Sequence, residues 1–301
     1  MSRNSNTLPP LRRISTWLTL AVLQGCGRIA WPLQKRLGAC VGALAFHLMP
    51  ERRRAARINV DLCYPALTPQ AREVLVRDSF RDLGIGLFEF ARAWWGDADR
   101  FRQTVEIEGL EHIRSLQAEG RGVLLISGHF MTLEMCGRLL CDHVPLAGMY
   151  RPYRNPMMER AVMDGRLRYA TRMFGNDETR PAIRHLKQGG VLWYAPDQDM
   201  RGKETVFVPF FGVPAATITA THQFARISGC AVVPFFHRRE GDRYILRIAP
   251  PLADFPTQDA VEDTSRVNAA IEAMVREAPT QYLWIHRRFK RQPDGVSRYA
   301  D

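Results

Sequence analysis

The segment GRGVLLISGHFMTLEMCGRLL contains a histidine and a glutamate five residues apart, His129 and Glu134. The apolar run before them predicts a buried strand over 123–127, and the apolar residues after them recur at helical spacing. If His129 lies in the turn between strand and helix, its ring can swing back toward Glu134. A histidine held by a carboxylate is equipped to act as a general base.

The spacing alone does not identify the site. A chain of this composition is expected to contain about one such pair by chance, and His237 and Asp242 form a second pair. That pair lies in HRREGDRY, which has the features of a hairpin turn between two apolar runs. A hydrogen-bonded turn histidine is therefore an alternative interpretation of His129.

Further candidates follow predicted strands, where α/β folds bind their ligands. Arg151 and Arg154 come after a strand at 146–150, and two arginines on a turn can bind phosphate; a solvated loop is the alternative. Asp197 and Asp199 follow a strand at 191–195, with Arg201 and Lys203 beyond. Because these acids have no histidine partner in the sequence, phosphate or sugar binding is favoured over a metal site.

A basic cluster in QYLWIHRRFKRQPDG is either a solvated face or a docking surface for an acidic partner. Its members are His286, Arg287, Arg288, Lys290 and Arg291.

Composition narrows the class of protein. The chain has 301 residues, of which 46% are hydrophobic, so it can bury a large core and is not a polytopic membrane protein. Its six cysteines form no C-x-x-C pair and no cluster with histidines, which indicates neither a zinc site nor a disulfide framework. They are typical of a reduced protein that faces the cytosol.

Residues 1–57 carry ten basic side chains and one acidic side chain, a net charge of +9. Apolar stretches at 14–27 and 37–49 in this region are shorter than the roughly 20 residues that cross a bilayer. We interpret the region as a retained membrane anchor that either spans the bilayer with snorkelling arginines or lies in the interface. A cleaved signal peptide lacks a convincing cleavage site, and nucleic-acid binding lacks a motif.

The sequence predicts membrane-anchoring or interfacial helices at 1–50 and one domain at 51–301. That domain comprises a helical lead-in at 51–100, with a capped helix starting at Thr68–Pro69, and an α/β core with a mixed sheet at 101–301. Strands are predicted at 123–127, 146–150, 191–195, 206–209, 231–236 and 244–248, and core helices at 130–141, 156–173, 179–188, 217–228 and 262–277.

Several strings in the chain resemble the late acyltransferases of lipid A biosynthesis, the lauroyl and myristoyl acyltransferase type, within the lysophospholipid acyltransferase superfamily. The resemblance covers nearly the whole chain and implies a glycerol-3-phosphate acyltransferase-like α/β fold with a mixed sheet flanked by helices. Besides the H-x-x-x-x-E block, the strings are RRRAARINVDLCYP, FEFARAWW, YRPYRNP, GVLWYAPDQD, VFVPFFG, VVPFF and QYLWIHRRFKRQPDGVSRY.

The family's catalytic histidine and acid match His129 and Glu134, its arginine block matches Arg151, and its acidic block matches Asp197 and Asp199. The resemblance implies transfer of a fatty acyl chain from acyl carrier protein to a lipid A precursor of the Kdo2-lipid IVA type. The acceptor would be the hydroxyl of a 3-hydroxyacyl chain, and the product an acyloxyacyl group. The place implied is the cytoplasmic face of the bacterial inner membrane, with no cofactor or metal required.

In this scheme His129 is the general base and Glu134 orients its ring. The basic cluster near the C-terminus would dock the acidic carrier protein. Sequential transfer is favoured over an acyl-enzyme on Ser127 or Cys136, because the segment lacks the glycine-framed serine of a hydrolase elbow. The alternatives are an acyltransferase for another glycolipid or a lysophospholipid, and a catalytically silent membrane-binding protein.

Overall fold

The computed structural model describes residues 9–96, 104–200 and 204–299. Its centre is a seven-stranded sheet in the order β1-β9-β8-β2-β5-β3-β4, in which only β8 and β9 pair antiparallel. The strands are β1 (Val105–Glu108), β2 (Val123–Ile126), β3 (Leu146–Tyr150), β4 (Arg172–Gly175), β5 (Val191–Tyr194), β8 (Ala231–Glu240) and β9 (Arg243–Ile248). A separate antiparallel hairpin is formed by β6 (Thr205–Phe210) and β7 (Val213–Ile218).

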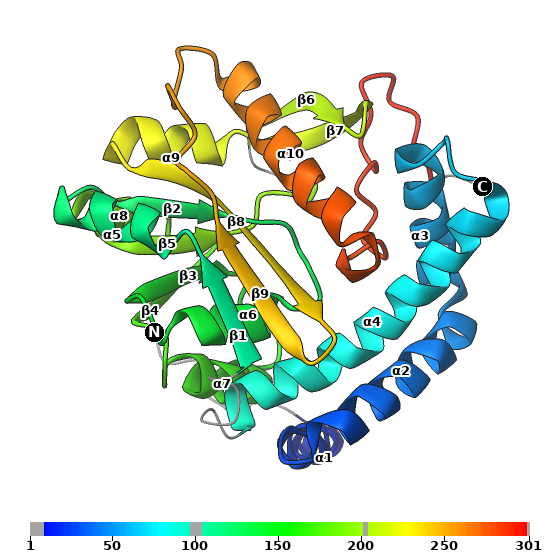
Figure 1. Ribbon diagram of the computed structural model, residues 1–301. Helices are drawn as coiled ribbons and strands as arrows, with labels where there is room; N and C mark the ends of the chain where they lie inside the picture. The colour runs from blue at the N-terminus through cyan, green and yellow to red at the C-terminus, as the bar shows by residue number, and fades with distance from the viewer. Residues whose placement is uncertain (1–8, 97–103, 201–203, 300–301) are drawn as a thin grey trace.

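Helices cover both faces of this sheet, so β2 is buried on both sides and its sequence VLLI is apolar throughout. Leu124 and Ile126 pack into one core cluster with α8 (Thr179–Lys187), α9 (Ala220–Ser228) and α10 (Ala260–Glu277). Val123 and Leu125 pack into another with α5 (Leu110–Ala118) and α6 (Leu133–Leu140). Figure 1 shows α10 next to β8 and the β6–β7 hairpin. One more helix, α7 (Pro156–Arg166), lies between β3 and β4 in the chain.

Four helices precede the sheet: α1 (Pro10–Gly27), α2 (Trp31–Leu48), α3 (Pro50–Cys63) and α4 (Pro69–Trp95). α2 runs along α4 (Figure 1), and the two backbones meet at glycines. A Cβ on Gly84 would lie 2.0 Å from the carbonyl oxygen of Gly38, and one on Gly42 would lie 2.0 Å from the carbonyl oxygen of Phe80. A side chain at either position would therefore push α2 away from α4.

The N-terminal helices expose apolar side chains at helical spacing. On α1 the exposed residues include Ile14, Trp17, Leu18 and Val22. On α2 they include Leu33, Leu37, Val41, Leu44 and Leu48. Among the residues that the structure describes, no helix is long and apolar enough to cross a membrane.

The α/β class, the mixed sheet and all six predicted strands are confirmed. Strands β1, β4 and β7 were not predicted, and each is short or lies next to a segment predicted as helix. The helix predicted at 156–173 ends at Arg166 because β4 begins at Arg172. The helix predicted at 217–228 begins at Ala220, since β7 continues to Ile218. The hairpin predicted around HRREGDRY is present, but only Gly241 and Asp242 form its turn.

Candidate active site

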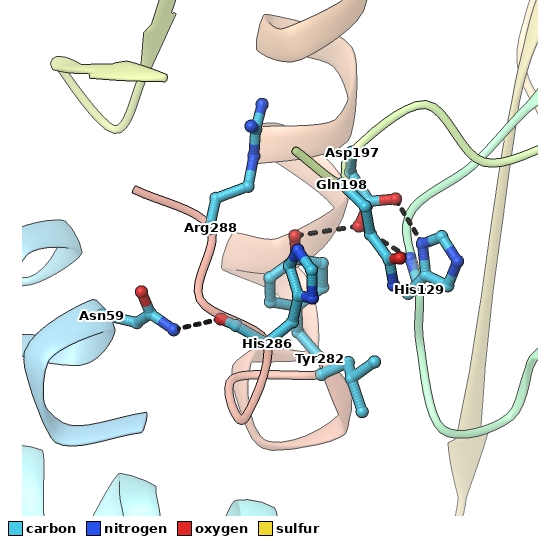
Figure 2. A pocket seen from close by; sticks show the side chains of 8 residues that line it. Asn59, His129, Asp197, Gln198, Tyr282, His286 and Arg288 are labelled. Carbon is cyan, nitrogen blue, oxygen red and sulfur yellow. Dashed lines mark hydrogen bonds and ion pairs between the residues drawn. The ribbon is translucent and has the colours of Figure 1, made fainter. Parts of the chain in front are cut away.

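His129 lies in the loop between β2 and α6, where its ring and its backbone both bind Asp197. The backbone N–H of His129 donates to Asp197 Oδ2 over 2.9 Å, and His129 Nδ1 lies 2.5 Å from Asp197 Oδ1. Asp197 follows β5, which pairs parallel with β2, so the two residues leave the sheet at the same edge. Figure 2 shows the two side chains facing each other.

Asp197 is almost fully buried, at 1% exposure, and Tyr282 also donates to its Oδ2 over 2.9 Å. Burial opposes the charged carboxylate, but the charge of His129 and these hydrogen bonds outweigh it and hold the pKa of Asp197 well below its usual range. Asp197 is therefore a carboxylate at neutral pH. It accepts the Nδ1 proton of His129, and in the neutral ring the lone pair lies on Nε2.

The side chain of His129 remains 30% exposed. Burial alone would lower the pKa of its imidazole, but the charge and hydrogen bond of Asp197 outweigh that effect and raise the pKa above its usual value. The pair thus consists of an ionised acid and a histidine whose basicity the acid increases, which is the arrangement of a general base with its orienting group.

The expected contact between Glu134 and His129 is not made, and this part of the sequence prediction is wrong. Glu134 lies in the first turn of α6. Its carboxylate accepts a hydrogen bond from Trp94 Nε1 over 3.0 Å and forms an ion pair with Arg166 of α7. The helix directs Glu134 toward α4 and α7, whereas the end of β5 brings Asp197 to the histidine. The participation of Glu134 in catalysis stays a prediction.

His129 and Glu134 both line a cavity of about 710 Å³, within the range of ligand-binding pockets. Polar groups including Arg151, Arg166 and Gln198 share the cavity with an apolar section. Side chains and glycines from α6, β3, β4 and β5 contribute to that section: Leu133, Gly137, Leu146, Gly148, Met149, Met173 and Trp193. The cavity can therefore hold an apolar chain beside a reactive polar group.

The other candidate residues that follow predicted strands do not all lie at the same place in the structure. Arg151 is exposed and lines the cavity, whereas Arg154 is exposed but does not line it. Asp199 lines the cavity but is already neutralised by an ion pair with Arg291, whose Nε lies 2.6 Å from Asp199 Oδ1. Arg201 and Lys203 lie outside the described residues.

The basic cluster near the C-terminus is not a single surface. Arg288 is buried and donates to the backbone oxygen of Ala216 and to Thr217 Oγ1, each over 2.7 Å. The prediction that Arg288 is available to a docking partner is therefore wrong, and Arg291 is partly buried and already paired with Asp199. Of the five members of the cluster, only Arg287 and Lys290 are exposed, and Lys290 lines the cavity.

Two residues of the same C-terminal segment belong to the site, although the sequence alone did not indicate Tyr282 and indicated His286 only as a member of the basic cluster. Tyr282 binds Asp197, and His286 lines both the large cavity and an adjoining one of about 10 Å³, roughly the room of one water (Figure 2). Burial lowers the pKa of His286 to about 4, so its ring is neutral at physiological pH. The sequence signal was the string QYLWIHRRFKRQPDG, which carried the family resemblance but whose side chains we interpreted as a charged surface.

His237 and Asp242, the second pair with the same spacing in the sequence, lie in different environments and have different partners. His237 lies within β8 and is fully buried, whereas Asp242 lies in the hairpin turn and forms an ion pair with Lys35. Within 9–96, 104–200 and 204–299, no group of three or more histidine, cysteine, aspartate or glutamate side chains could hold a metal ion.

Replacing the carboxylate that holds His129 should change the basicity of the ring. In Asp197→Asn the charge of Asp197 is lost while burial remains, so the pKa of His129 should fall below that of the unmodified protein. An NMR titration of the imidazole resonances measures this shift. Glu134→Gln is the matched control and should leave the pKa of His129 unchanged; a larger shift in Glu134→Gln than in Asp197→Asn would contradict the pairing.

Comparison with known proteins shows the family to which the chain belongs. Residues 2–291 match the family described as bacterial lipid A biosynthesis acyltransferase. The chain is 40% identical to the lipid A biosynthesis lauroyltransferase of Escherichia coli (strain K12) over 288 residues, 94% of each chain. It is 37% identical to the palmitoleoyltransferase of the same organism, over 94% of this chain and 93% of the relative. Identity to that organism's myristoyltransferase is 27%, over 94% and 89%. The protein is thus an acyltransferase and belongs to the bacterial lipid A biosynthesis acyltransferase family.

Proposed function

We propose that this protein transfers a fatty acyl chain from acyl carrier protein to a lipid A precursor of the Kdo2-lipid IVA type. The acceptor is the hydroxyl of a 3-hydroxyacyl chain, and the product is an acyloxyacyl ester. The observation that carries the proposal is the His129–Asp197 pair opening onto a cavity with an apolar section. Family membership supports the lipid A precursor as the substrate class.

In the first step, Nε2 of neutral His129 takes the proton of the acceptor hydroxyl while the hydroxyl oxygen attacks the thioester carbonyl carbon. A new C–O bond forms, and the carbonyl oxygen becomes an oxyanion. Asp197 stabilises the imidazolium that results, because its carboxylate already accepts the Nδ1 proton. General base catalysis of this kind contributes about 10²–10⁴-fold to the rate.

In the second step, the tetrahedral intermediate collapses and the C–S bond breaks. The sulfur takes the proton from the imidazolium and leaves as the thiol of the carrier's prosthetic arm, so His129 is again neutral. Arg151 is an exposed cation on the cavity wall, and it is suited to hold a phosphate of the acceptor or to face the oxyanion.

The transfer is direct, without an acyl-enzyme. The sequence places two nucleophiles close to His129, Ser127 and Cys136, and both are fully buried. Ser127 Oγ is hydrogen-bonded to His237, and burial raises the pKa of the Cys136 thiol well above its usual value, so it stays a poor nucleophile. Neither side chain lines the cavity that His129 faces.

We propose further that the exposed apolar side chains of α1 and α2 lie in the interface of the bacterial inner membrane, on its cytoplasmic face. Trp17, at 64% exposure, and Leu44, at 57%, belong to this surface. The arginines Arg12, Arg13 and Arg36 are exposed on the same two helices and complement anionic headgroups. An interfacial site would give the enzyme access to a lipid acceptor within the bilayer.

The acidic carrier protein docks at the two exposed members of the C-terminal basic cluster, Arg287 and Lys290. Lys290 lines the cavity, so a carrier bound there would have a short path for its acyl chain to His129. Arg287 adds a second exposed cation, with a side chain 44% exposed.

Mass spectrometry tests the reaction. Purified protein is incubated with a tetra-acylated lipid A precursor carrying its Kdo sugars and with a mixed pool of acyl carrier proteins. One added acyl mass is expected, and His129→Ala should lower the rate by about 10²–10⁴-fold because the base is lost. A rate of acyl gain that is unchanged in His129→Ala would contradict the mechanism, and no gain in the unmodified protein would favour another glycolipid or a lysophospholipid as acceptor.

Vesicle binding tests the membrane surface. Trp17→Ser combined with Leu44→Ser should weaken sedimentation with anionic phospholipid vesicles by at least about tenfold, because two exposed apolar contacts are lost. Val261→Ser combined with Val296→Ser removes two exposed apolar side chains elsewhere and should leave binding unchanged. Equal binding by the two double variants would argue against the proposed surface.

Steady-state kinetics at low salt test the docking site. Arg287→Ala combined with Lys290→Ala should raise the KM for acyl carrier protein several-fold, since steering of an acidic partner is lost. Arg77→Ala combined with Arg81→Ala removes the same charge from an exposed part of α4 and is the control. The docking proposal fails if the two double variants have the same KM.

A further inference from the structure

One buried histidine binds both ends of the loop that carries His129. His237 Nε2 lies 3.1 Å from Ser127 Oγ, at the end of β2, and His237 Nδ1 lies 2.9 Å from Thr132 Oγ1, at the start of α6. The side chains of His237, Ser127 and Thr132 are all fully buried. The loop at 127–132 is thus closed by a bridge from β8, a strand outside the loop.

The chemistry of the bridge is matched to a neutral imidazole. A neutral ring has one nitrogen that donates and one that accepts, and a hydroxyl can do either. Ser127 and Thr132 therefore satisfy both nitrogens in either tautomer. Burial lowers the pKa of His237 to about 3, so the bridge remains neutral over the physiological pH range.

The ring of His237 is held in place by its surroundings. The rings of Phe130, Trp193 and Phe235 lie around it, with centroids 5.2–5.6 Å from its own. The first part of β8, as far as Pro234, pairs with β2, and the part that carries His237 pairs with β9, where His237 is opposite Leu246. Because the ring of His237 is held by these contacts, it can fix the position of the 127–132 loop and does not move with it.

We propose, on the basis of the acyl transfer inferred above, that His237 is a positioning residue that clamps the 127–132 loop and thereby fixes His129 for catalysis. Its contacts complement those in the middle of the loop, where the N–H of His129 binds Asp197 and its carbonyl accepts from the N–H of Leu283 over 3.0 Å. Without the clamp, His129 keeps Asp197 but the ends of its loop are released.

Kinetics of three variants of the full chain test the clamp. His237→Phe keeps the ring volume but removes both hydrogen bonds, and kcat is expected to fall by about 10–100-fold with KM for either substrate little changed, because a displaced base costs rate rather than binding. His237→Gln keeps one donor and one acceptor and should recover part of kcat. His222→Phe is the control, since His222 is another buried histidine, but its ring binds Asp263 of α10. Its kcat should stay within about threefold.

A second measurement does not depend on activity. The Nδ1 proton of His129, hydrogen-bonded to Asp197, gives an NMR resonance that should shift or broaden in His237→Phe and stay unchanged in His222→Phe. If the unmodified protein transfers no acyl group, the proposed function fails, whereas this comparison still tests the clamp.

Single-hydroxyl variants cover the case in which His237→Phe does not fold. Ser127→Ala and Thr132→Val each remove one end of the bridge, and each should lower kcat and shift the His129 resonance. The proposal is overturned if folded His237→Phe, or both single variants, retain kcat within about threefold of the unmodified protein and an unshifted His129 resonance.

Discussion

The structure of the site depends on one buried carboxylate. A charge as deeply buried as that of Asp197 is costly unless it is hydrogen-bonded, and three donors satisfy it: the backbone and ring of His129 and the hydroxyl of Tyr282. These donors come from the loop after β2 and from the segment after α10. Asp197 therefore joins the end of β5 to two other parts of the chain while it sets the basicity of the histidine.

The two acids near His129 have separate roles in this account. Asp197 acts on the ring, and Glu134 is held by Arg166 and Trp94 in the wall of the cavity. The ion pair of Glu134 and Arg166 places two charged groups beside an apolar section without leaving either unpaired. In the proposed reaction, the group that moves the proton, His129, is thus separate from the ion pair of Glu134 and Arg166 in the cavity wall.

Much of this architecture could be predicted from the sequence, because buried strands such as VLLI carry an unambiguous apolar signal. The placement of His129 between a strand and a helix followed from the same pattern. The partner of His129 could not be predicted, because Asp197 is distant in the chain and reaches it only through the parallel pairing of β2 and β5. Periodicity gave no warning that Arg288 is buried, since a charged residue at a strand or loop position can be satisfied by backbone oxygens from elsewhere in the fold.

The central claim is that Asp197, and not Glu134, makes His129 an effective base for acyl transfer. The most direct test is the pH dependence of the single-turnover transfer rate in the unmodified protein, Asp197→Asn and Glu134→Gln. Transfer requires neutral His129, so the rate rises with pH through the pKa of its ring. The account predicts that Asp197→Asn moves this rise to lower pH and lowers the plateau rate, while Glu134→Gln leaves the position of the rise unchanged. A rise that moves in Glu134→Gln but not in Asp197→Asn would contradict it.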